Sequence, residues 1–132
     1  MITLYPSWIE IPAHDLARAL AFYRAVFELT DTPRYDEPTM QIVVLRASDK
    51  SVERPGVSLV RTAEHRPNPS GVLVNFHVGA HANLAAALER AVAHGGALVG
   101  PTVELEDGVR YTSLRDSEGN TIAVSSYEVD AT

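Results

Sequence analysis

A carboxylate and an imidazole occupy matching places in two similar segments of this chain. Glu10 precedes the dipeptide Ala13-His14 as His77 precedes Ala80-His81, at an offset of 67 residues (77 − 10 = 67). Such a pair can act as a general acid and base, or bind a polar group of a ligand. Two alternatives remain open. The two side chains could bond to each other or to buried water and only stabilise the interior, or they could belong to a displaced metal site.

Four further side chains are candidates for ligand binding. Trp8 and Asn75 lie two residues before the pair (8 + 67 = 75), and side chains two apart on a strand share a face. The Trp8 indole could stack on a planar ligand, or it could only fill the core. Tyr111 and Ser125 could offer a phenol and a hydroxyl, or be ordinary strand residues. The histidines at 14 and 81 are expected in turns before helices, that at 65 in a linker and that at 94 at a helix end.

The elements that must position these side chains also repeat. Residues 8–27 and 75–94 each contain an alternating strand, an Ala-His pair and an amphipathic helix. Leu16 and Leu84 match at an offset of 68 (84 − 16 = 68), so one residue is inserted in the second turn. A repeat of this length in 132 residues predicts two modules packed as one domain, 1–132. Module 1 covers about residues 5–62, the linker about 63–70 and module 2 about 71–128.

The pattern of apolar residues predicts the order βαβββ in each module. Asp15 is a plausible N-cap for the first helix, and Gly95-Gly96 a C-cap for the second. The predicted elements are a strand at 7–12, a helix at 16–27, a loop around 31–38, a strand at 40–46, a turn at 47–55 and a strand at 56–61; then a strand at 72–78, a helix at 84–93, strands at 97–99, 109–115 and 121–127, and a hairpin turn at 116–120.

Composition disfavours several kinds of partner, location and chemistry. The formal net charge is −6 with dispersed acidic residues, which disfavours a nucleic-acid partner. No apolar run approaches the roughly 20 residues of a membrane span, and no secretory signal is visible, so a cytoplasmic protein is expected. The absence of cysteine removes disulfides, thiolate metal ligands and a cysteine nucleophile.

Three segments resemble the vicinal-oxygen-chelate superfamily, the group of glyoxalase, bleomycin-resistance and extradiol-dioxygenase proteins. They are EIPAHDLARALAFYRAVF at residues 10–27, LERAVAHGGALV at 88–99 and SLRDSEGNTIAVSS at 113–126. The resemblance implies an α+β fold in which two βαβββ modules form an open, curled, barrel-like cleft with helices outside. It also implies a cleft that holds a divalent metal or a flat organic ligand, and a homodimer.

The same resemblance assigns the family's metal-ligand positions to Trp8, Asn75, Ala123 and a residue near Ser58. These residue types suit a divalent ion poorly, so no metal ligand and no cofactor is expected. The sequence therefore favours a protein that binds a small organic molecule through Trp8, Asn75, Tyr111 and Ser125. The alternative is a lyase or isomerase of the glyoxalase-related kind that works through Glu10 and His77, with or without a metal. A non-catalytic partner domain has no specific support.

Overall fold

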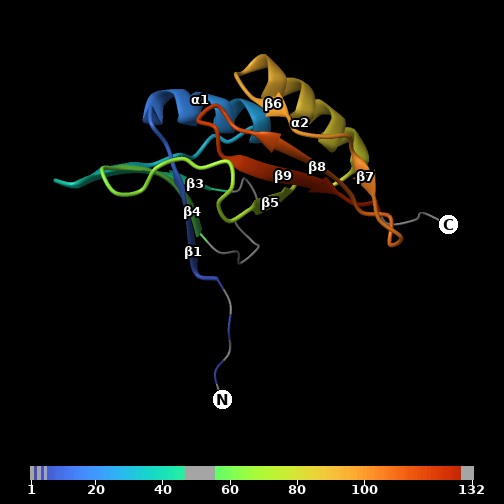
Figure 1. Ribbon diagram of the computed structural model, residues 1–132, viewed down its shortest axis with the longest axis horizontal. Helices are drawn as coiled ribbons and strands as arrows, with labels where there is room; N and C mark the ends of the chain where they lie inside the picture. Colours follow the sequence, from blue (N-terminus) through green and yellow to red (C-terminus); the bar gives the residue numbers. More distant parts are fainter. Residues whose placement is uncertain (1, 3, 5, 47–55, 129–132) are drawn as a thin grey trace.

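The computed structural model describes residues 2, 4, 6–46 and 56–128. Two helices lie along one side of two β-sheets (Figure 1). The predicted α+β class is confirmed, and within the described residues the two sheets do not close into one barrel.

The first sheet is formed by module 1. Its strand order is β1-β4-β3-β2, in which β1 pairs with β4 in parallel and the other neighbours are antiparallel. The elements are β1 (Trp8–Pro12), α1 (Leu16–Phe27), β2 (Arg34–Asp36), β3 (Met40–Leu45) and β4 (Gly56–Thr62).

Module 2 repeats this arrangement. Its strand order is β5-β9-β8-β6, again with a parallel first pair, and the short strand β7 also pairs with β8. The elements are β5 (Val74–His77), α2 (His81–Ala93), β6 (Ala97–Leu98), β7 (Val103–Glu104), β8 (Arg110–Arg115) and β9 (Thr121–Ser126).

Helix α1 has the predicted bounds because local signals define both ends. The Asp15 carboxylate accepts the Arg18 N–H, as an N-cap does. Glu28 ends the helix in the left-handed region (φ 55°), and the next N–H, of Leu29, returns to the Arg24 carbonyl.

Helix α2 begins at His81, three residues before the predicted start at 84. Ala80 offers no side-chain cap, so nothing local marks this end. Distant residues stabilise it instead: the His81 N–H donates to the Glu128 carboxylate (3.1 Å), and its ring Nδ1 lies 2.7 Å from the Ser126 hydroxyl. The predicted start was wrong because it followed the apolar stripe alone.

Strand β2 corrects the predicted loop around residues 31–38. All three of its residues are exposed and show no alternation, so no apolar pattern could reveal it. It forms because it pairs with β3, with Tyr35 opposite Ile42. Strand β7 was likewise not predicted, and the predicted turn at 47–55 lies outside the described residues.

The core lies between the helices and the sheets. Helices α1 and α2 contact each other, and the Arg90 guanidinium of α2 donates to the Val26 carbonyl of α1 (2.8 and 3.2 Å). The fully buried large side chains include Phe22, Tyr23, Val26, Leu59, Leu114, Ile122 and Val124.

No helix among the described residues is long and apolar enough to cross a membrane.

The turn at residues 116–120 joins the two modules. The buried Asp116 carboxylate accepts the Tyr23 hydroxyl at 2.7 Å and the Asn120 side-chain amide at 3.1 Å. The same amide donates to the Pro12 carbonyl at the end of β1 (2.8 Å). Burial, and next the Asp116 carboxylate, raise the pKa of the Tyr23 phenol well above its ordinary value of 10.0.

Glu118 in the same turn binds the first residues of α1 through its carboxylate. Its carboxylate accepts the Asp15 N–H and the Arg18 Nε–H, both at 2.7 Å. Burial opposes the charged form of Glu118, but the hydrogen bonds from Arg18, Asp15 and Ser117 outweigh it, so its pKa lies below the ordinary value of 4.5. The turn therefore holds the N-terminus of α1 by a charged group from the other module.

Candidate functional site

The predicted site residues lie on the sheet faces turned away from the helices. Ile9 and Ile11 of β1 pack with the helix-side core, as do Phe76 and Val78 of the β5 segment. The residues between and before them, Trp8, Glu10, Asn75 and His77, are all exposed. We call this surface the helix-free face, and the alternation within each strand is as the sequence predicted.

One row of side chains crosses the helix-free side of each sheet, and the two rows match. In the first sheet, Glu10 lies opposite Ser58 of β4, and Ser58 lies opposite Val44 of β3. In the second sheet, His77 lies opposite Ser125 of β9, and Ser125 lies opposite Tyr111 of β8. Ser58 and Ser125 are related by the repeat offset (125 − 58 = 67), and so are Gly56 and Ala123 (123 − 56 = 67). The register thus places the module-1 equivalent of Ala123 at Gly56, two residues before the expected position near Ser58.

Trp8 is fixed over its neighbouring strand. Gly56 lies opposite it, and a Cβ on Gly56 would sit 2.2 Å from the indole atoms Cε3 and Cζ3. The indole N–H donates to the Ser58 hydroxyl at 3.0 Å. Half of the side chain (50%) nevertheless stays exposed. The ring is therefore held in one orientation and still presents surface, unlike an aromatic residue that only fills a core.

Glu10 and His77 lie on β1 and β5, the outer strands of the two sheets. Both are exposed, and no hydrogen bond joins them among the described residues. Ser125 is buried (8% exposed), and Tyr111 is partly buried. The second module therefore offers an accessible imidazole beside a hydroxyl and a phenol.

The residues that the resemblance assigns to the metal-ligand positions are poor ligands for a divalent ion. The register gives Trp8 and Gly56 in module 1 and Asn75 and Ala123 in module 2. None of these is a carboxylate, an imidazole or a thiolate. Across the described residues, no three acidic or histidine side chains gather where they could hold an ion.

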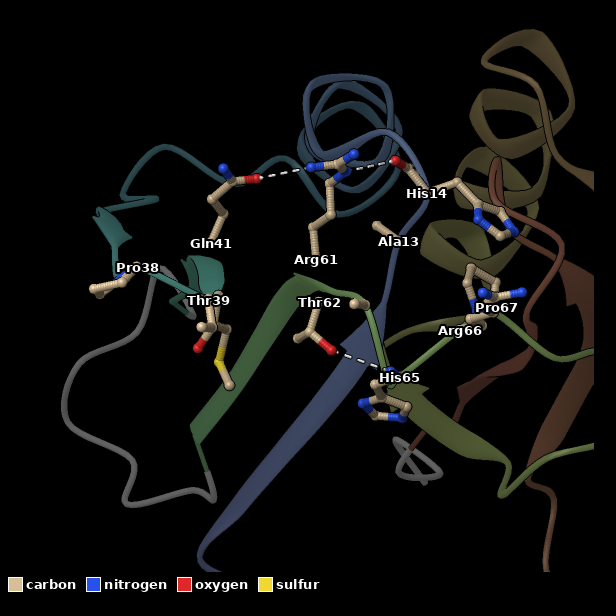
Figure 2. A pocket seen from close by; sticks show the side chains of 12 residues that line it. Ala13, His14, Pro38, Thr39, Gln41, Arg61, Thr62, His65, Arg66 and Pro67 are labelled. Atoms are coloured by element: carbon tan, nitrogen blue, oxygen red, sulfur yellow. Dashed lines mark hydrogen bonds between the residues drawn. The ribbon is translucent and has the colours of Figure 1, made fainter.

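A pocket that was not predicted from the sequence lies at the far end of β1. It lies where β1 and β4 end and β3 begins, beside the linker at 63–67 (Figure 2). His14 and His65 line it, although both were expected only as turn and linker residues. No sequence signal could have revealed it, because its residues come from three separate segments, 13–14, 38–41 and 61–67.

The comparison with family models matches residues 6–124 to the Glyoxalase/Bleomycin resistance protein/Dioxygenase superfamily. The chain belongs to this superfamily. The match spans both modules, so the resemblance seen in the three sequence segments is confirmed. The comparison with curated proteins found no match.

Solved structures share the superfamily fold at low sequence identity. A glyoxylase/bleomycin resistance protein/dioxygenase domain from Frankia sp. EAN1pec has a TM-score of 0.73 at 16% identity, over 98% of this chain and 96% of that one. A glyoxalase-related enzyme from Fulvimarina pelagi reaches 0.67 at 20% identity, over 98% and 94%. A lactoylglutathione lyase from Agrobacterium tumefaciens reaches 0.66 at 19% identity, over 95% of each chain. These likenesses establish the fold.

Proposed function

We propose that this superfamily member binds a small organic molecule with a planar part on its helix-free face, without a divalent metal at the usual positions. The observation that carries the proposal is the orientation of Trp8. Its ring is held by Gly56 and Ser58 while half of it stays exposed, so a ligand can stack on it without first ordering the side chain. Asn75, Tyr111 and Ser125 supply polar contacts from the second module.

The donor set supports the metal-free part of the proposal. A glycine and an alanine stand where the register places the last-strand ligands, and a tryptophan and an asparagine stand on the first strands. Metal analysis of the purified protein tests this directly. A stoichiometric amount of nickel, zinc, manganese or iron would overturn it.

Intrinsic fluorescence tests the binding part, because Trp8 is the sole tryptophan of the chain. Planar aromatic compounds that raise the melting temperature in a thermal-shift screen should also change Trp8 emission. Trp8→Ala should weaken their binding by roughly 2- to 12-fold, the equivalent of about 0.5–1.5 kcal/mol for an aromatic contact. Tyr35→Ala is the matched control, since Tyr35 is equally exposed (51%) but lies on the far strand β2. Equal losses in both variants would refute the site.

A second candidate function is a lyase or isomerase that uses Glu10 and His77. The exposure of both side chains favours it, because a carboxylate and an imidazole without mutual bonds are available to a substrate. Glu10→Gln and His77→Ala separate the two functions once a ligand is known. Loss of turnover with retained affinity would indicate catalysis, whereas a change in affinity alone would indicate binding.

A further inference from the structure

The pocket at the strand ends differs in charge from the rest of the molecule. It has a volume of about 480 Å³, and two arginines (Arg61 and Arg66) and two histidines (His14 and His65) line it. No Asp or Glu belongs to its lining within the described part of the chain. The whole chain carries 17 acidic residues and 11 Lys and Arg residues. The pocket lining is therefore positively charged in a protein whose net charge is negative.

Arg61 is already oriented before any ligand arrives. Its Nε–H donates to the His14 carbonyl (3.1 Å), and one terminal N–H donates to the Gln41 side-chain carbonyl (3.4 Å), as Figure 2 shows. A guanidinium has five N–H donors, so three remain for a ligand. Both partners are neutral acceptors, which leaves the charge of Arg61 uncompensated by these bonds. Such a fixed, planar fork matches the geometry of a carboxylate or a phosphate.

The start of the linker is shaped by Thr62. The Thr62 hydroxyl accepts the N–H groups of Glu64 and His65, both at 3.1 Å, and this turn carries His65 and Arg66 along the pocket. The hydroxyl keeps its own hydrogen as a donor. The linker is held again beyond the pocket, where the Asn68 N–H donates to the Asn120 side chain at 3.1 Å. Two attachments therefore fix the segment that brings the second arginine.

The remaining lining is apolar or neutral. Ala13, Pro38, Met40 and Pro67 supply carbon surface, so the pocket suits more than a bare inorganic ion. The nearest acidic residues along the chain, Asp15, Glu37 and Glu64, are exposed and lie outside the lining. The pocket is also distinct from the helix-free site, because Trp8 and His14 stand at opposite ends of β1.

We propose that this pocket is a binding site for a small organic anion, whose carboxylate or phosphate group is held by Arg61 and Arg66 and whose carbon part lies on Met40 and the prolines. Charge-assisted hydrogen bonds from two arginines supply the affinity, and the prior orientation of Arg61 lowers the cost of forming them.

Titration of the ¹⁵N-labelled 132-residue protein with succinate and with inorganic phosphate tests this inference. Each titration is made at constant ionic strength, with sodium chloride as the reference salt. Saturable shifts of the amides at 39–41 and 61–66 are expected with at least one of the two probes. Succinate alone would identify a carboxylate site, and phosphate alone a phosphate site.

Three variants make the test specific. Arg61→Gln and Arg66→Gln should each raise the dissociation constant by about tenfold. Arg24→Gln is the matched control, since it makes the same change in net charge at an exposed position of α1 and should alter affinity less than twofold. Arg61→Gln could also disturb the pairing of β3 with β4, in which Arg61 takes part. Arg66→Gln tests the inference without this complication, because Arg66 lies in the linker. The inference is overturned if neither probe gives saturable shifts, or if Arg24→Gln weakens binding as much as the pocket variants.

Discussion

Removing one hydroxyl group should measure how strongly the turn at 116–120 joins the modules. Tyr23→Phe deletes the hydrogen bond of 2.7 Å to the Asp116 carboxylate. The ring itself should stay in place, because it packs in an aromatic cluster against Phe22, Phe27 and Phe76. The variant therefore isolates the polar contact from the packing of the core.

The size of the effect follows from what Asp116 retains. Its carboxylate still accepts the backbone N–H groups of Glu118 and Asn120 (2.8 and 3.0 Å) and the Asn120 side-chain amide (3.1 Å). A hydrogen bond to a charged group contributes roughly 1.5–3 kcal/mol, and with three donors left we expect a loss of about 2 kcal/mol. For a domain of this length that corresponds to about 6–10 °C in melting temperature.

Urea unfolding and calorimetry of the two proteins at pH 7 give this difference. Tyr35→Phe is the control: Tyr35 is exposed, and its variant should stay within about 0.5 kcal/mol of the parent protein. A second variant, Asp116→Asn, should destabilise more, because an amide places a donor where a carboxylate oxygen accepts. If Tyr23→Phe is no less stable than Tyr35→Phe, the hydrogen bond between Tyr23 and Asp116 does not stabilise the contact between the modules.

Three further outcomes follow from single contacts. The pKa of Glu118 is lowered in the folded protein, so its stabilising effect is complete above the ordinary value of 4.5 and is lost as the pH falls through the folded value. The difference in urea midpoint between the parent protein and Glu118→Gln should therefore shrink as the pH falls from 7 to 3. A difference that stays constant over this range would contradict the prediction. Gly56→Ala should lower stability by about 1–3 kcal/mol and shift Trp8 fluorescence, since the methyl group would meet the indole at 2.2 Å; Gly100→Ala, with no atom within 4 Å, is its control. Asp15→Ala should cost about 1 kcal/mol in urea unfolding through loss of the α1 cap, with exposed Asp36→Ala as the comparison.

The sequence predicted those parts of the fold that local signals determine. Helix α1 has an N-cap at Asp15 and an apolar stripe, and both bounds were right. Helix α2 was predicted too short because contacts from Ser126 and Glu128, about 45 residues away, stabilise its first turn. Strand β2 was missed for a related reason, since its exposed residues are ordered by pairing with β3.

The candidate site could be predicted only within single strands. Alternation correctly placed Trp8 and Glu10 on one side of β1. It could not show that Gly56 lies under the indole, because this depends on the register between β1 and β4. The basic pocket was missed entirely, since no pattern in the sequence links Gln41, Arg61 and the linker.

The contacts between module 1 and the turn at 116–120 affect the order in which the chain folds. The contacts of Tyr23, Arg18, Asp15 and Pro12 with the turn span 93 to 108 residues of sequence. During synthesis, β1 and α1 leave the ribosome long before their partners in the turn exist. Contacts of such long separation raise the contact order and slow folding. We therefore expect the N-terminus of α1 to lack its Glu118 partner, and the first module to stay incompletely folded, until the turn at 116–120 has been made.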